Sequence, residues 1–311
     1  MRQPRSCALL MLSLLLFSLT SYTSAQDSQT ATVLMKHYPG TRAVVAVMVN
    51  GKGPYDFIVD TGATMTIVDQ ALFAELKLPI QGRIAVYSSA AVSSGLGSTG
   101  EISINTLFVR NLSVVGMETL IGGTEYRGVR GILGENFLHN FDILIDNQHK
   151  QISLDAGHVL ADTLTGDHLA IRFASAPGEE DAHLRPRLLV RVHNFGDADV
   201  LLDSGATEMV LFRWGSPNSR QSDGTALQTI NGKLPCAATL NTVNFSTHNL
   251  LEIVVATCVS GTVRPGSHEG ILPTAIFKQI FISHAGSYVI VNPVRLRSVS
   301  EDGVMLAASS R

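Results

Sequence analysis

Short apolar runs separated by turn residues dominate the chain, and they predict strands rather than long helices. In the first half, an apolar run over 44–50 ends at Gly51-Lys52-Gly53-Pro54 and is followed by a second run over 55–59. In the second half, two runs over 188–192 and 199–202 follow in the same order. Runs of about four to eight apolar residues bounded by Gly, Pro and Asn are typical of buried β-strands. We therefore expect an all-β protein, mainly β with a few short helices.

A short polar string follows the second run of each half. It is Asp60-Thr61-Gly62-Ala63-Thr64 in the first half and Asp203-Ser204-Gly205-Ala206-Thr207 in the second, and apolar residues follow both. Further along, Gly131-Ile132-Leu133-Gly134 has a counterpart in Gly270-Ile271-Leu272-Pro273. The two isoleucines lie 72 and 68 positions after the aspartate of their own half. Similar elements at similar offsets predict an internal duplication into two related lobes.

These strings indicate a pair of carboxyl groups. One such string is ordinary turn chemistry, in which Gly supplies the unusual backbone angles. Two strings can bring Asp60 and Asp203 together, and two adjacent carboxyls hold one proton between them because they cannot both ionise cheaply. The charged member can take a proton from water while the protonated member donates to a peptide carbonyl. We therefore predict that Asp60 and Asp203 are the catalytic residues of a peptide hydrolase that needs no metal and no other cofactor.

The residues on both sides of Asp60 resemble the retropepsin-like aspartic proteases, duplicated within one chain as in the pepsin-like enzymes. Two segments carry the resemblance, Phe-Ile-Val-Asp-Thr-Gly-Ala-Thr at 57–64 and Ile-Leu-Gly-Glu-Asn-Phe-Leu at 132–138. It extends over residues 40–155 and, more weakly, over 185–293. The resemblance implies a bilobed acid-protease fold built from two related β-barrel-like lobes.

The same resemblance assigns supporting roles in the active-site loops to Thr61, Gly62, Ser204, Gly205 and Gly134. The hydroxyls of Thr61 and Ser204 would reach across to the backbone of the other lobe and lock the two loops together. Pro273 stands where the second lobe should carry its supporting glycine. Because proline fixes its own φ and has no N–H, we expect the packing behind Asp203 to differ from that behind Asp60.

The N-terminus and the charge pattern indicate an exported protein. Residues 1–25 combine early arginines, an apolar stretch and a Thr-Ser-Ala cleavage pattern, which are typical of a signal peptide. We expect a first lobe at 26–160, a linker at 161–186, a second lobe at 187–311, and a secreted or periplasmic location. No later segment is long and apolar enough to span a membrane, and a net charge of −3 gives no reason to expect a nucleic acid partner.

Cysteine and glycine patterns add smaller expectations. After cleavage only Cys236 and Cys258 remain, and they either form a disulfide or stay as two buried thiols. The string at 95–100 matches a dinucleotide-binding fingerprint in letters alone, and we interpret it as a loop because a strand-like alternation follows it. The histidines show no pair at helical spacing, so no metal is expected. Two strings, 88–100 and 229–233, are either flaps over a cleft or plain mobile loops.

Three functions fit these observations. The first is an exported, monomeric aspartic endopeptidase that cleaves extended peptides with the Asp60/Asp203 pair. The second is a peptide-binding protein of the same fold that has lost catalysis through the change at Pro273. The third is a homodimer that pairs Asp60 from two chains, as retropepsins do.

Overall fold

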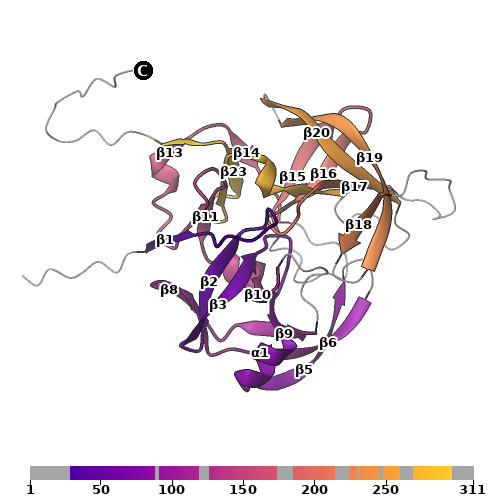
Figure 1. Ribbon diagram of the computed structural model, residues 1–311. Helices are drawn as coiled ribbons and strands as arrows, with labels where there is room; N and C mark the ends of the chain where they lie inside the picture. Colours follow the sequence, from indigo (N-terminus) through magenta and orange to yellow (C-terminus); the bar gives the residue numbers. More distant parts are fainter. Residues whose placement is uncertain are drawn as a thin grey trace, which may run out of the picture.

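The computed structural model describes residues 29–87, 91–118, 126–173, 185–213, 225–229, 232–245, 248–259 and 269–295. The signal-peptide prediction for 1–25 and the tail beyond residue 295 lie outside these residues. Strands dominate the described part of the chain, and only short helices accompany them, which confirms the all-β prediction (Figure 1). Within this part, no helix is long and apolar enough to cross a membrane.

The first half forms a nine-stranded sheet in the order β5-β6-β9-β4-β10-β3-β2-β7-β8. Its strands are β2 (Val44–Val49), β3 (Lys52–Val59), β4 (Thr66–Asp69), β5 (Ile80–Tyr87), β6 (Ala91–Ser98), β7 (Glu101–Ile104), β8 (Leu107–Arg110), β9 (Ser113–Met117) and β10 (Val129–Leu133). At its centre β10 runs parallel to β3 and antiparallel to β4, and β4 runs parallel to β9. Two helices belong to this half, α1 (Gln70–Glu75) and α2 (Glu135–Leu138).

The second half forms a seven-stranded sheet in the order β15-β16-β21-β17-β20-β19-β18. Its strands are β15 (Arg187–Val192), β16 (Gly196–Asp203), β17 (Met209–Arg213), β18 (Thr225–Thr229), β19 (Gly232–Phe245), β20 (His248–Val259) and β21 (Gly270–Pro273). The centre repeats the first half, because β21 runs parallel to β16 and antiparallel to β17, and β17 runs parallel to β20. A further pairing of β15 with β19 closes this sheet into a barrel. Internal duplication stays a prediction, and the shared strand order supports it.

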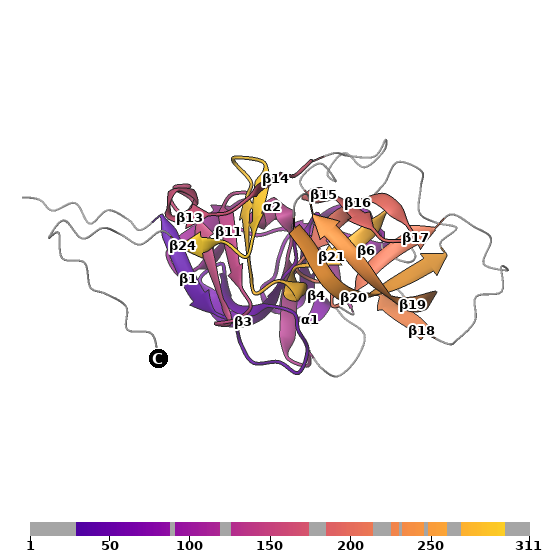
Figure 2. The same ribbon diagram turned by 90° about the horizontal axis from the view of Figure 1, so that it is seen from above.

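A six-stranded sheet joins the halves in the order β1-β12-β11-β22-β23-β14. Its strands are β1 (Thr30–Leu34), β11 (Asp142–Asp146), β12 (Gln151–Asp155), β14 (His168–Ala170), β22 (Gln279–Ser283) and β23 (Tyr288–Val291). The junction is the antiparallel pair of β11 with β22, one strand from each half. Figure 2 shows this sheet at one end of the molecule and the strands of the second-half barrel at the other.

The segment 161–186, predicted as a linker, carries structure of its own. It contains a 3-10 helix, η1 (Ala161–Thr163), and the short strand β13 (Leu164–Thr165), which pairs with β24 (Val294–Arg295). It also contains β14, which extends the six-stranded sheet. The domain boundaries themselves stay a prediction.

The first hairpin shows how local sequence fixes the geometry leading to the site. Asn50 and Gly51 both have positive φ, 51° and 71°, which is the conformation of a type I′ turn and the reason an Asn-Gly pair stands here. The turn is therefore shorter than the 51–54 segment expected from sequence, and β3 begins at Lys52. Its last residues, Phe57 to Val59, are fully buried and carry the chain into the Asp60 loop.

One hydrophobic cluster runs through both halves. It includes Val59 and Leu133 near the first loop, Leu202 and Leu272 near the second, and Ile143 and Ile280 of the joining sheet. Burial of apolar side chains is the main favourable term in folding. In this cluster it holds the strands that lead into the two aspartate loops against each other.

The prediction of a loop at 95–100 is wrong for most of its length. Residues up to Ser98 belong to β6, which pairs with β5 and β9. A Cβ on Gly97 would run into the ring of Phe73, so the glycine lets the strand pass over α1. Glycine enrichment here reflects close packing of a strand and not the flexibility of a loop.

Candidate active site

The two predicted aspartates lie at matching places in the fold. Asp60 follows β3 directly, and Asp203 is the last residue of β16. Asp60 Oδ1 accepts hydrogen bonds from the backbone N–H groups of Gly62 and Ala63, at 2.9 and 3.1 Å. Asp203 Oδ1 accepts the same pair from its own loop, Gly205 at 2.7 Å and Ala206 at 2.9 Å. Each loop therefore holds its carboxyl group in a fixed orientation.

The two carboxyl groups face each other. They share a side-chain hydrogen bond, and both residues are half-buried. A Cβ on Gly62 would lie within 2.8 Å of the carboxyl atoms of Asp203, and one on Gly205 within 2.7 Å of those of Asp60. No real side chain tolerates such contacts, so glycine at these two positions is what allows the carboxyls to meet.

The hydroxyls of Thr61 and Ser204 lock the loops together across the two halves. Thr61 Oγ1 donates to the carbonyl of Leu202 at 2.8 Å and accepts from the N–H of Ser204 at 3.0 Å. In return, Ser204 Oγ donates to the carbonyl of Val59 at 2.8 Å and accepts from the N–H of Thr61 at 3.0 Å. Both residues are buried, and the four bonds form the reciprocal contact that the family resemblance implies.

Burial and mutual repulsion set the protonation of the pair. Burial raises the pKa of Asp60 well above its ordinary value, and the charge and hydrogen bond of Asp203 raise that pKa further. Burial also raises the pKa of Asp203, although hydrogen bonds from Asp60 and from the backbone N–H groups of Gly205 and Ala206 act against it. The positive charge of Arg42 lowers the pKa of both. The pair therefore retains one proton at a pH where two separate carboxyls would both be ionised.

The support behind the two loops is unequal. Behind Asp60, Gly134 donates its N–H to Thr66 Oγ1 at 3.2 Å, and a Cβ on Gly134 would lie within 2.9 Å of the carbonyl of Ala63. The N–H of Glu135 donates to that carbonyl at 2.8 Å.

Behind Asp203, the supporting position is occupied by Pro273, which pairs with Asp203 in the parallel ladder of β16 and β21. Pro273 has a φ of −72°, which suits proline, and it precedes a 3-10 helix, η3 (Thr274–Ile276), in place of the α-helix of the first half. Proline has no N–H to donate, and Met209 stands where the first half has Thr66 as acceptor. The backbone direction is thus kept while the hydrogen bond is absent.

Both candidate flaps belong to β-hairpins. Strands β5 and β6 pair as far as Tyr87 and Ala91, and β18 and β19 pair as far as Thr229 and Gly232. The tips, 88–90 and 230–231, lie outside the described residues. Their role as flaps stays a prediction.

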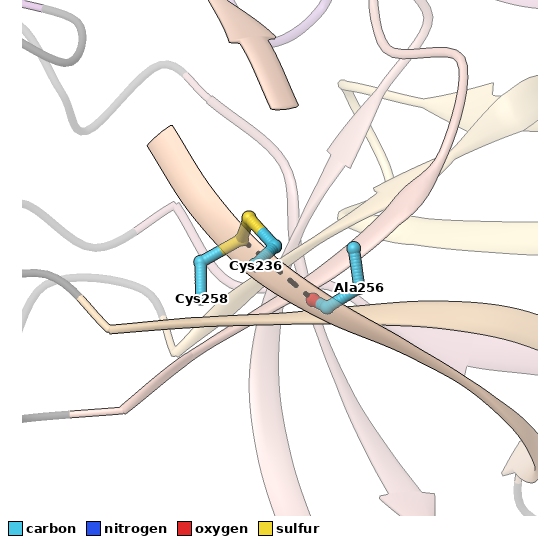
Figure 3. The surroundings of a disulfide bond; sticks show 3 residues. All are labelled: Cys236, Ala256 and Cys258. Carbon is cyan, nitrogen blue, oxygen red and sulfur yellow. Dashed lines mark hydrogen bonds between the residues drawn. A yellow bond between two sulfur atoms is a disulfide. The ribbon is translucent and has the colours of Figure 1, made fainter. Parts of the chain in front are cut away.

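Cys236 and Cys258 form a disulfide in the structure (Figure 3). They lie directly opposite each other on the neighbouring strands β19 and β20. Cys258 Sγ lies 4.0 Å from the carbonyl oxygen of Ala256, and because a disulfide sulfur carries no hydrogen, this contact is packing. The disulfide stiffens the second-half barrel. Both cysteines lie at a distance in sequence from the two aspartate loops.

Three further charged residues near the loops were not found from sequence. Arg42 donates through Nε to the carbonyl of Gly205, and its guanidinium lies 5.1 Å from the centre of the Tyr126 ring. Arg185 donates to the carbonyl of Gly62 at 3.4 Å. Glu135 is fully buried.

Glu135, His139 and His284 have ligand atoms within 4.8 Å of one another, a spacing that could hold a metal ion. His284 already contacts the carbonyl of Phe141 through Nδ1 at 2.7 Å and Glu135 Oε2 through Nε2 at 3.0 Å. The charge of Arg185 also acts on Glu135. These contacts describe a buried ion-pair network, and a cation entering it would meet repulsion from Arg185.

Comparison with known proteins agrees with the geometry of the first half. In that geometry, an Asp-Thr-Gly loop of an all-β chain lies against a matching loop of the other half. Residues 45–140 match the protein-family model described as gag-polyprotein putative aspartyl protease. This segment, which includes Asp60 and Gly134, is therefore similar to an aspartyl protease family.

Other comparisons are more distant. One matching structure is the crystal structure of a retropepsin-like aspartic protease from Rickettsia conorii, at 15% sequence identity and a TM-score of 0.30. The match covers 40% of this chain and 90% of that one. A search of the curated proteins finds no match.

Proposed function

We propose that this chain is an exported aspartic endopeptidase that acts as a monomer and hydrolyses extended peptides with the Asp60/Asp203 pair. The observation that carries the proposal is the contact between the two carboxyl groups, each oriented by two backbone N–H groups of its own loop. Export rests on the sequence of residues 1–25 alone.

The geometry supports a general acid–base reaction on a bound water. With one proton between the two carboxyls, the ionised member accepts a proton from water as the water oxygen attacks the peptide carbonyl carbon. The protonated member donates to the carbonyl oxygen, which gives a tetrahedral intermediate with two hydroxyls. As the C–N bond breaks, the pair donates a proton to the amide nitrogen and takes one back from one of these hydroxyls. The proton taken from water thus replaces the proton given up, and the pair returns to its starting state.

The pKa directions predict the pH range of this reaction. Activity needs the singly protonated pair, so it falls at low pH when the second proton binds and at high pH when the last proton leaves. Because burial and the neighbouring carboxyl raise the pKa of Asp60, the upper limit lies above the ordinary range of carboxyl groups.

The test is hydrolysis of a peptide mixture by the purified chain from about pH 3 to about pH 8, a range that brackets the titration of carboxyls and histidines. We expect cleavage that a statine-type transition-state mimic blocks. Asp60→Asn and Asp203→Asn should each lower kcat/KM by a factor on the order of 10² or more. Asp162→Asn, a change at an exposed aspartate outside the site, is the matched control and should keep full activity.

The other two functions predict different results. Full activity of Asp203→Asn would mean that Asp60 pairs with its equivalent in a second chain, and that the pair within one chain is not the catalyst. Tight peptide binding without cleavage at any pH would identify a binding protein of this fold.

A further inference from the structure

Two arginines occupy corresponding places in the two halves. Each lies two residues before a strand, Arg42 before β2 and Arg185 before β15, and 18 positions before the aspartate of its own half. Each donates to the glycine carbonyl of the opposite loop, Arg42 to Gly205 and Arg185 to Gly62. The two halves thus exchange a second pair of hydrogen bonds beside the hydroxyl lock.

The surroundings of these arginines differ in charge. Arg185 acts on Glu135, the first residue of α2, and Glu135 pairs with His284, which directly follows β22. In the other half, the first residue of η3 is Thr274, and the residue that directly follows β11 is Asn147. Asn147 Nδ2 donates to the carbonyl of Thr274 at 3.0 Å. The positions equivalent to Glu135 and His284 are therefore occupied by neutral residues in the other half, Thr274 and Asn147.

Arg42 instead directs its charge toward the catalytic pair. Its charge acts on both Asp60 and Asp203, and the stacked ring of Tyr126 lies against it. Within the described residues, it forms no salt bridge with a carboxylate, and it is half-buried. A guanidinium has five N–H donors, of which Nε–H is used by Gly205, so donors remain beside the place where a peptide must bind.

We infer that Arg42 determines specificity by binding the carboxylate of an aspartate or glutamate side chain close to the scissile bond of the substrate. This inference rests on the proposed function. A peptide whose carbonyl reaches the pair brings its neighbouring side chains close to the guanidinium, because Arg42 contacts the carbonyl of Gly205 and the backbone of Gly205 lies against the carboxyl of Asp60. Bidentate pairing with a planar guanidinium favours a carboxylate over an amide of the same shape.

The experiment measures cleavage of matched peptides that differ only by Glu, Gln or Lys at each position around one scissile bond. At about pH 6, where glutamate is ionised, we expect the best-placed Glu peptide to exceed its Gln partner in kcat/KM by about tenfold. The ratio should fall toward one below about pH 4, where glutamate is protonated. Lys at the same position should give the slowest cleavage.

Variants separate recognition from general damage, because a ratio of two substrates cancels any common loss of activity. Arg42→Gln should bring the Glu/Gln ratio to about one, and Arg42→Lys should keep part of it. Arg185→Gln is the matched control, since Arg185 makes the same backbone contact but faces an internal acid. It should leave the ratio unchanged. A structural role alone would lower both rates and preserve the ratio in all three variants.

The outcomes also separate this inference from the proposed function. Cleavage with no Glu/Gln difference at any position would overturn the inference and leave the endopeptidase in place. Absence of cleavage, together with fluorescence-anisotropy binding that prefers the Glu peptide and loses this preference in Arg42→Gln, would overturn the endopeptidase and keep the recognition. A preference for Lys peptides would refute the role of Arg42 directly.

Discussion

Replacement of Thr61 by valine tests whether the hydroxyl lock holds the two aspartate loops together. Valine has nearly the same shape as threonine, so the change removes the hydroxyl with little change in packing. Two hydrogen bonds disappear, the one donated to Leu202 at 2.8 Å and the one accepted from the N–H of Ser204 at 3.0 Å. Both bonds are buried, so no water replaces the lost hydroxyl.

The magnitude follows from these contacts. Each of the two lost bonds costs about 1 kcal/mol, and the buried N–H of Ser204, left without an acceptor, adds about 1 to 3 kcal/mol, so Thr61→Val should cost roughly 3 to 5 kcal/mol. For a chain of this size, a cost of about 3 kcal/mol lowers Tm by roughly 6 to 12 °C. A displacement of the loop by about 1 Å would reduce kcat/KM by a factor on the order of 10².

The assay combines thermal unfolding with peptide hydrolysis. Thr165→Val is the control, because Thr165 also donates its hydroxyl to a backbone carbonyl, that of Val294 at 3.2 Å, but it is exposed and far from the loops in sequence. Its effect should stay within about 0.5 kcal/mol. If Thr61→Val matched this control in both stability and activity, the six-stranded sheet and not the lock would be what joins the loops.

Two further predictions concern the close approach of the loops and the buried ion pair. Gly62→Ala should cost about 1 to 3 kcal/mol and abolish hydrolysis, because the new Cβ collides with the carboxyl of Asp203; unfolding and peptide assays check both effects. Burial lowers the pKa of His284, but Glu135 outweighs this effect, so the folded-state pKa is raised above 6.5. Burial also raises the pKa of Glu135, so the stability that the ion pair supplies is complete only at a pH above that pKa and below about 6.5. It is lost as pH rises through the raised pKa of His284, at up to about 1.4 kcal/mol per pH unit. Urea unfolding should show this decline in the parent chain and not in His284→Gln.

The residues of the two aspartate loops can be identified from the sequence because the motif is local. Each aspartate, its hydroxyl neighbour and its glycine are consecutive residues, and apolar strands on both sides fix where they stand. The disulfide alternative could also be stated in advance, since only Cys236 and Cys258 remain after the predicted cleavage. The aspartate loops are identified by residue type and by their place in a repeated pattern, and the cysteines are identified by residue type alone.

The charged surroundings could not be predicted, because their contacts join distant parts of the chain. Glu135 and His284 are 149 residues apart, and the guanidinium of Arg42 meets a glycine 163 residues away. Nothing in the local pattern of either arginine says that it crosses to the other half. A comparison of equivalent positions in the two halves is the one signal that could have found them, because both arginines stand 18 positions before an aspartate.

The prediction of a loop at 95–100, most of which lies in β6, was wrong for a different reason. Its glycines have no side chains to alternate between two faces, so the period of a strand is invisible in the letters. The cause lies in another element, the ring of Phe73 on α1, which leaves no room for a Cβ at Gly97. A rule that assigns glycine-rich segments to flexible loops is therefore wrong where close packing requires the glycine.

A single chain with two lobes permits something that a symmetric dimer of one lobe does not. In a dimer with twofold symmetry, every residue beside the carboxyl pair appears twice, so a cation on one side implies a cation on the other. Here the backbone contacts remain symmetric, with two hydroxyls, two glycines and two arginines in equivalent places. The balancing charge is one-sided, because Glu135 interacts with Arg185 and pairs with His284, while the equivalent residues of the other half, Thr274 and Asn147, are neutral. Under the proposed function, a single chain with two lobes thus separates the positioning of the carboxyls, which needs symmetry, from the charge around them, which discriminates between the two ends of a bound peptide.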